Sequence, residues 1–211
     1  MNIQTYLDIQ KAAAEGNVAK IKHLITSPKE FFEFDNELAF IDQAIHYNQF
    51  EVIKYFIELA LDEYPEEVVP IILYEDVLRK ACSKGQFDFV KYCFDVFNKR
   101  LGGAHNKLLI EVLAEDDYKT FKWTSYNKEF KVAEFIVDTM REWDFVQNIN
   151  EMLDDVYWHA VREAQIDILK FLFQLAVKYL QTEQRIKLIN ELLTYSKNDY
   201  VSEYLLSMFN C

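Results

Sequence analysis

Residues 12–25 read Ala12-Ala-Ala-Glu-Gly-Asn-Val-Ala-Lys-Ile-Lys-His-Leu-Ile25, and this order returns twice with little change. The second copy is Ala44-Ile-His-Tyr-Asn-Gln-Phe-Glu-Val-Ile-Lys-Tyr-Phe-Ile57, and the third is Ala81-Cys-Ser-Lys-Gly-Gln-Phe-Asp-Phe-Val-Lys-Tyr-Cys-Phe94. Weaker copies run over residues 123–136 and 160–173. A unit that returns every ~20 to 50 residues is typical of a repeat protein.

Each copy is centred on a residue that favours a tight turn, and neighbouring turns lie 32 to 42 residues apart. Four of the five positions hold Gly or Asn, which adopt the left-handed backbone conformation more readily than other residues. We therefore expect each position to end one helix and to precede a second. The predicted turns are Gly16, Asn48, Gly85, Asn127 and Ala164.

The residues around the turns follow a constant pattern. Apolar residues stand five, eight and nine positions after each turn, as Ile53, Phe56 and Ile57 do in the second copy, and this spacing defines one face of a helix. Two short helices joined by a turn cannot bury such faces alone, so the copies are expected to stack on one another. The position four residues before each turn holds a small residue in four of the five copies. These residues are Ala12, Ala44, Ala81 and Ala160, and the fourth copy has Trp123 there.

The copies resemble the second half of the ankyrin repeat, which reads Ala-Ala-x-x-Gly-(His/Asn)-x-(Asp/Glu)-(Ile/Val)-Val-x-x-Leu-Leu. The resemblance covers about residues 7–175, and the degenerate copies resemble those of intracellular bacteria and large viruses. It implies an all-α fold, a helix-turn-helix repeat solenoid that residues 1–211 form as a single domain.

Two departures from a regular ankyrin array are expected. The intervals between turns mostly exceed the usual repeat of about 33 residues, so extra helices are predicted in the connectors 64–74, 101–114, 143–154 and 182–195. Residues 182–211 are expected to form a C-terminal cap, with Tyr204, Leu205 and Leu206 facing inward.

The composition favours a helical protein that stays in solution. Only four glycines and three prolines occur in 211 residues, too few for a protein built of many short strands. No uncharged apolar run approaches the length that spans a bilayer, and the first residues do not resemble a secretion signal. Three cysteines without CxxC spacing fit a reducing compartment. We expect a cytoplasmic protein, and the resemblance adds delivery into a host cell as a further expectation.

The sequence contains no motif for catalysis, a metal or a cofactor. Its four histidines fall in four different segments without the spacing of metal ligands. Cys82 and Cys93 lie within the predicted helices of the third copy, where burial is expected. Gly102-Gly103 lacks the Lys-Ser/Thr pair of a phosphate-binding loop. We therefore expect no catalytic, metal-binding or cofactor-binding residues and no small-molecule substrate.

The charge distribution favours a protein as the partner. The formal net charge of −12 disfavours nucleic acid and anionic membranes. Residues 60–76 hold six acidic residues and residues 142–156 hold five, without any Lys or Arg. These acidic connectors are the alternative binding surface if the helices themselves do not bind.

The resemblance implies that the first helix of each copy lines a concave face, with outward positions five, two and one residue before the turn. Basic residues outnumber acidic ones at these positions, and aromatic residues recur there. Tyr, Trp and Arg dominate the energetics of protein interfaces. The predicted partner-binding residues are His46, Tyr47, Lys80, Lys84, Lys122, Trp123, Tyr126, His159 and Arg162.

The function expected from these observations is a protein-protein interaction module. Two alternatives remain open at the level of sequence. One is an enzyme whose active site is assembled from dispersed residues, which a cluster of groups with shifted pKa values in one pocket would favour. The other is a helical adaptor of another repeat type, such as the tetratricopeptide repeat, although its Trp-x-x-Leu-Gly signature is absent.

Overall fold

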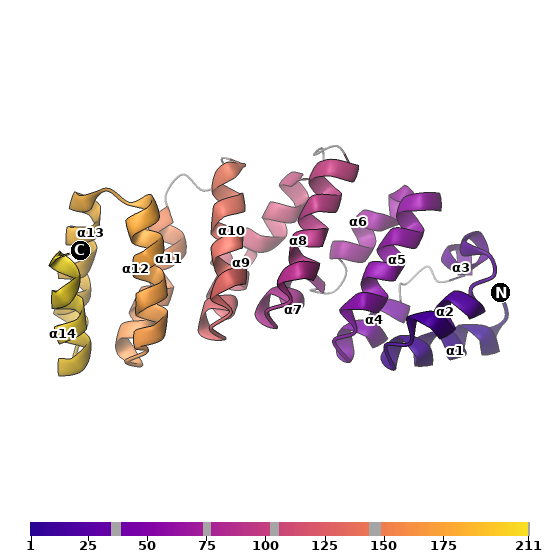
Figure 1. Cartoon of the computed structure of the whole chain (residues 1–211), viewed down its shortest axis with the longest axis horizontal. Coiled ribbons are helices and arrows are strands. Elements are labelled where there is room, and N and C mark those ends of the chain that lie inside the picture. Colours follow the sequence, from indigo (N-terminus) through magenta and orange to yellow (C-terminus); the bar gives the residue numbers. More distant parts are fainter. Residues whose placement is uncertain (35–38, 74–76, 102–105, 144–148, 211) are drawn as a thin grey trace. The chain divides into compact units, whose positions relative to one another are not determined.

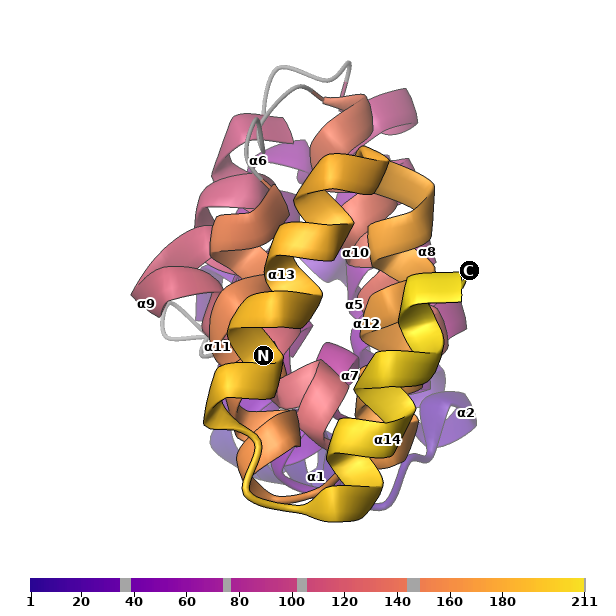
Figure 2. The same cartoon turned by 90° about the vertical axis from the view of Figure 1, so that its left-hand side faces the viewer.

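A computed structural model describes residues 1–34, 39–73, 77–101, 106–143 and 149–210, and these residues form helices without any strand (Figure 1, Figure 2). The all-α class expected from the scarcity of glycine and proline is therefore confirmed. None of the described helices combines the length and apolar character needed to cross a membrane. The chain separates into two compact units, which we call unit 1 (Met1–Cys82 with Gln86–Val112) and unit 2 (Ser83–Gly85 with Leu113–Cys211).

The helices follow one another with short connections. From the N-terminus, the first elements are α1 (Ile3–Ala14), α2 (Val18–Leu24), α3 (Pro28–Phe34), α4 (Ala39–His46), α5 (Phe50–Glu63), α6 (Pro65–Leu73), α7 (Val77–Ser83), α8 (Phe87–Asp95) and the π-helical η2 (Val96–Arg100). The remaining elements are α9 (Asn106–Tyr126), α10 (Phe130–Glu142), α11 (Ile149–Arg162), α12 (Ile166–Tyr179), α13 (Thr182–Tyr195), α14 (Asp199–Ser207) and the 3-10 segment η3 (Met208–Asn210).

Five helix pairs are closed by the same hydrogen bond. In each pair a residue with positive φ follows the first helix, and the next amide donates to a carbonyl five residues before it. These bonds measure 2.7 to 3.0 Å, and their geometry is that of a Schellman motif, which satisfies carbonyls that a helix end leaves without partners. The bonds are Asn17 to Ala12, Gln49 to Ala44, Gln86 to Ala81, Glu129 to Thr124 and Gln165 to Ala160.

The fourth turn lies one residue later than expected. Lys128, with φ of 64°, is its left-handed residue, whereas the sequence favoured Asn127. The small residue four positions before the turn is therefore Thr124, which is fully buried, and Trp123 is 48% exposed. A shift of one residue turns a helix position by about 100°. Ser125 stands two residues before Asn127, which predicts an outward side chain, but it stands three residues before the actual turn and is buried.

The second helices α5, α8 and α12 bury the apolar face that the spacing predicted, whereas in the first copy only Ile21 is buried and Leu24 and Ile25 are half-buried. In α5 the residues Ile53, Phe56 and Ile57 are inaccessible to solvent, and the equivalent residues of α8 and α12 are also buried. In α10 the buried face follows the corrected turn, so that Ala133, Ile136 and Val137 occupy it. The corresponding residues of the other buried faces are Val90, Cys93, Phe94, Leu169, Leu172 and Phe173.

Neighbouring pairs also contact each other through equivalent residues. In unit 1 the ammonium of Lys22 lies 5.2 Å from the centre of the Tyr55 ring, and Lys54 lies 5.1 Å from that of Tyr92. Each lysine stands six residues after its own turn, and each tyrosine stands seven after the next. The contact therefore repeats in the same register from α2 to α5 and from α5 to α8.

Helices form in both connectors that the structure largely describes. Residues 64–74 contain α6, which begins with Pro65, a residue suited to the first turn of a helix. Residues 182–195 form α13, so helical connectors are confirmed there. The other two connectors are helical over 106–114 and 149–154, while 102–105 and 144–148 lie outside the described residues.

The C-terminal helix α14 differs from the expectation at one residue. Val201 and Leu205 are buried, and Tyr204 is half-buried. Leu206 was expected to face inward but is 53% exposed. Asn198 caps the helix, and Val201 is the first residue of its buried face. Residues four apart lie on the same face of a helix, so Leu205 shares the face of Val201, whereas Leu206 lies to one side of it.

The closing turns predict substitution effects of opposite sign. Gly85→Ala should lower the free energy of unfolding by about 1 kcal/mol or more, because φ is +67° and a methyl group would press on the Glu129 carboxylate. Ala164→Gly should raise the free energy of unfolding by up to about 1 kcal/mol, because Ala164 has φ of 53°, a conformation that glycine adopts at lower cost than alanine. Urea denaturation of both variants checks this, and a loss of stability in Ala164→Gly would contradict it.

Candidate functional site

The nine predicted binding residues divide between the two units. His46, Tyr47 and Lys80 belong to unit 1. The other six belong to unit 2 and are Lys84, Lys122, Trp123, Tyr126, His159 and Arg162. Each group is described within its own unit.

In unit 1 His46 and Lys80 line a small polar cavity of about 310 Å³ at the end of α4, and Tyr47 is the neighbour of His46 along the chain. The ring of His46 meets that of Tyr47 edge-on at 4.8 Å, and both side chains are exposed. Lys80 is half-buried, and its ammonium donates a hydrogen bond to the carbonyl of Ile45. This lysine therefore ties α7 to the carbonyl end of α4, which is a structural use of its charge.

Lys122 has a similar structural role in unit 2. Its side chain is only 13% exposed and forms an ion pair with Asp155, which links α9 to α11. With the fourth turn at Lys128, Lys122 stands six residues before the turn and Trp123 takes the outward position. The outward placement predicted for Lys122 is therefore wrong. Lys84, which lies in the short Ser83–Gly85 segment of unit 2, is exposed.

Four predicted residues of unit 2 form a row on the turn side of α9 and α11. Trp123 and His159 stand five residues before their turns, and Tyr126 and Arg162 stand two before them. The Tyr126 ring lies 4.3 Å from that of His159, and the Arg162 guanidinium lies 3.4 Å from the ring nitrogen Nδ1 of His159. We call Trp123, Tyr126, His159 and Arg162 the turn-side row.

The row is partly ordered by its own contacts. Lys119 lies 4.8 Å above the Trp123 ring, a cation–π contact that holds the exposed indole. Burial against its neighbours raises the pKa of the Tyr126 phenol. Arg162 also donates a hydrogen bond of 2.9 Å to Glu163, yet its side chain is 73% exposed. The row thus offers two aromatic rings and a guanidinium in defined positions.

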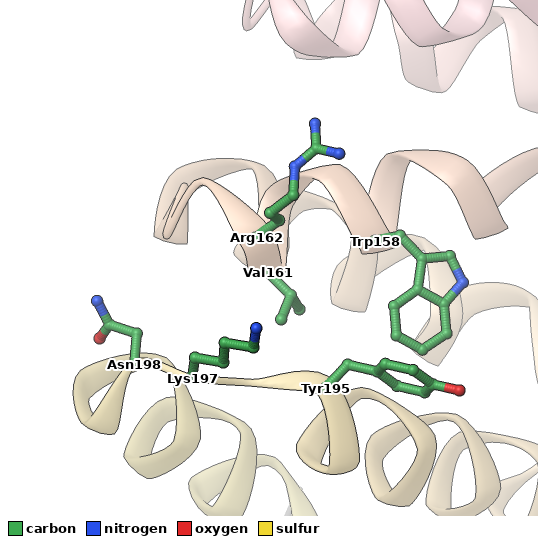
Figure 3. Close-up of a pocket in the computed structure, with 6 residues that line it drawn as sticks. All are labelled: Trp158, Val161, Arg162, Tyr195, Lys197 and Asn198. Carbon is green, nitrogen blue, oxygen red and sulfur yellow. The ribbon is translucent and has the colours of Figure 1, made fainter.

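A larger cavity opens beside Arg162, with a volume of about 660 Å³ (Figure 3). It lies between α11 and the segment that joins α13 to α14. The rings of Trp158 and Tyr195 meet at 4.4 Å with an interplanar angle of 82°. The residues that line the cavity are Trp158, Val161, Arg162, Tyr195, Lys197 and Asn198.

Sequence reasoning found one of these six residues, Arg162. Trp158 and Tyr195 come from different helix pairs, and no pattern along the chain links them. The signal available in the sequence was an aromatic residue at the end of the predicted helical connector 182–195. In the structure this residue, Tyr195, ends α13 and is 64% exposed. Such single residues are common on protein surfaces, so the signal is weak without the neighbouring Trp158.

Acidic residues flank the tryptophan end of the cavity. Burial raises the pKa of the Asp154 carboxyl, and the charges of Asp155 and Glu191 raise it further. A hydrogen bond from Trp158 acts in the opposite direction by favouring the ionised form of Asp154. The indole of Trp158 is thereby anchored on its outer edge.

The described residues offer little for metal or thiol chemistry. No group of three or more His, Cys, Asp or Glu side chains among them is arranged to hold a metal ion. Cys82 and Cys93 are buried, as expected, and burial raises the pKa of both thiols. A thiol held in its protonated form in an apolar environment is a poor nucleophile.

No family model, curated protein or solved structure matches the chain. The resemblance to ankyrin repeats stays an expectation from the residues alone. Function must then be argued from the side chains that the fold brings together.

The raised pKa of Asp154 predicts a pH-dependent stabilisation. Asp154→Asn should raise the midpoint of thermal unfolding at about pH 7, because folding disfavours the ionised carboxylate. A carboxyl whose pKa is raised in the folded state favours folding below its unfolded pKa, near 3.9, and this contribution is lost as the pH rises through the folded pKa.

The gain from Asn should therefore shrink as the pH falls from about 7 toward about 4. Thermal unfolding of wild type and variant across this range measures it. A lower midpoint than wild type at neutral pH, or a gain that grows with acidity, would contradict the assignment.

Proposed function

We propose that the chain is a stack of ankyrin-like helix pairs that binds another protein through the turn-side row of unit 2. The observation that carries this proposal is the meeting of Tyr126, His159 and Arg162, which stand at equivalent positions before two successive turns. Side chains at fixed positions before each turn are where an ankyrin-like stack would present residues to a partner.

Two features support the ankyrin-like part of the proposal. The five turns share one hydrogen-bonding pattern with a small buried residue at its start, as the repeat pattern requires. Side chains also reach back from one pair to the preceding first helix. Gln49 donates to the carbonyl of Ala14, and Asn127 donates to that of Ser83, two residues before the respective turns.

The residue types of the row favour a protein partner. Tyr, Trp and Arg combine a large contact area with few rotatable bonds or with several hydrogen-bond donors, and they dominate interface energetics. The net charge of −12 disfavours nucleic acid, and the row has one full positive charge, which Glu163 partly balances. We infer a protein surface as the partner, without a small-molecule substrate or a cofactor.

The proposal predicts which substitutions release a partner. With the whole chain immobilised and exposed to cytosolic proteins, Tyr126→Ala and Arg162→Ala should each reduce retention of the specific partner at least about fivefold, since truncating such residues in an interface commonly costs more than 1 kcal/mol. The partner is then purified and titrated against each variant to confirm the loss.

Lys170→Glu is the matched control, because Lys170 is exposed on α12, on the second helix of the same pair as Arg162. This variant should retain the partner as wild type does, and thermal unfolding of all three variants checks that the fold persists. Lys122→Glu is unsuitable, because it would place two carboxylates together at Asp155. Equal retention by all variants, or no retained protein, would contradict the proposal.

A further inference from the structure

The cavity beside Arg162 has two chemically different ends. Figure 3 shows Trp158 and Tyr195 facing each other at one end, with the indole nitrogen and the phenol oxygen directed away from Lys197. Lys197 extends from the segment between α13 and α14 toward Val161. The opening therefore has an aromatic wall on one side and an ammonium group on the other.

The aromatic end is suited to an apolar side chain. Val161 is 3% exposed and Trp158 is half-buried, so the rings stand over the apolar core of the pair. The edge-to-face contact at 4.4 Å holds both rings before anything binds. Because the rings are already positioned, an entering side chain gains apolar contact at a small cost in conformational entropy.

The charged end is suited to a carboxylate. Among the described residues, Lys197 has neither an ion pair nor a hydrogen bond. Some other lysines of unit 2 are engaged in ion pairs, as Lys128 is with Asp167 and Lys178 is with Asp138. Lys197 thus offers an ammonium that the fold leaves for an external anion.

We propose that this cavity binds an acidic peptide segment of the partner protein, with an aromatic or branched apolar side chain packed against the Trp158–Tyr195 pair and an adjacent carboxylate on Lys197. The inference rests on the proposed function and names the chemistry of the partner. A peptide suits the site better than a free small molecule because the cavity shares Arg162 with the turn-side row. A chain leaving the cavity past Arg162 continues onto His159 and Tyr126.

The acidic residues near the cavity set the direction in which the peptide lies. Asp154 accepts the hydrogen bond of the Trp158 indole, so its negative charge stands at the aromatic end. Glu163 is engaged by Arg162. A carboxylate is therefore expected at the Lys197 end alone, and a basic peptide would meet the unpaired ammonium there.

Three short peptides test the inference, each added to the whole chain labelled with ¹⁵N. The first carries one Phe between two Asp residues, the second replaces Phe by Ala, and the third replaces both Asp residues by Lys. The signal of the Trp158 indole N–H is followed, with assignment by Trp158→Phe. The first peptide should move this signal and leave that of Trp143 unchanged.

The expected affinities follow from the two ends of the cavity. Replacing Phe by Ala should weaken binding about tenfold or more, which corresponds to burying one aromatic side chain. Replacing Asp by Lys should weaken it at least about threefold, within the range of exposed charge pairs. In Lys197→Glu this charge preference should reverse, and in the control Lys170→Glu it should stay as in wild type.

Several results would overturn the inference. These are no shift of the Trp158 signal, equal binding of the Phe and Ala peptides, or an unchanged charge preference in Lys197→Glu. Self-association of the chain that Lys197→Glu abolishes would assign the cavity to a second copy instead. If the peptides fail while Tyr126→Ala and Arg162→Ala still release the captured protein, the cavity inference falls and the proposed function stands. If the variants also retain that protein, both fall.

Discussion

The organisation of this chain depends on one hydrogen bond that recurs at the five turns, donated by the amide after the left-handed turn residue to the carbonyl of a buried small residue at the end of the first helix. The bond reverses the chain within a few residues and satisfies a carbonyl that would otherwise lack a partner. A large side chain at the acceptor position would hold the helices apart. The buried Ala12, Ala44, Ala81, Thr124 and Ala160 meet this requirement.

The same closure determines which residues are available for binding. Once the acceptor is buried, the positions five, two and one residue before the turn point away from the second helix. Some of these side chains are used between pairs, since Lys80 donates to the carbonyl of Ile45 and Asn127 to that of Ser83. Four of the remaining side chains, Trp123, Tyr126, His159 and Arg162, make up the proposed surface. The structural contacts and the proposed binding surface therefore draw on side chains at the same helix ends.

Much of the fold was predictable from local chemistry, and the candidate site was predictable only in part. Gly16, Asn48 and Gly85 favour positive φ by residue type, so their turns were visible in the sequence. Lys128 has no such preference, and the buried Thr124 fixes its position through packing, which explains the error of one residue and the loss of Lys122 from the row. Trp158 and Tyr195 meet through tertiary packing, and no local pattern reveals that contact.

Amide hydrogen exchange by NMR tests the closing hydrogen bond most directly. The account predicts that the amides of Asn17, Gln49, Gln86, Glu129 and Gln165, although they lie outside the helices, exchange about as slowly as amides within the adjoining helix ends, because each donates to a buried carbonyl. The amide of Glu129 is the most informative, since the turn at Lys128 and not at Asn127 makes it the donor. Exchange of these five amides at the rate of an unstructured peptide would contradict the account.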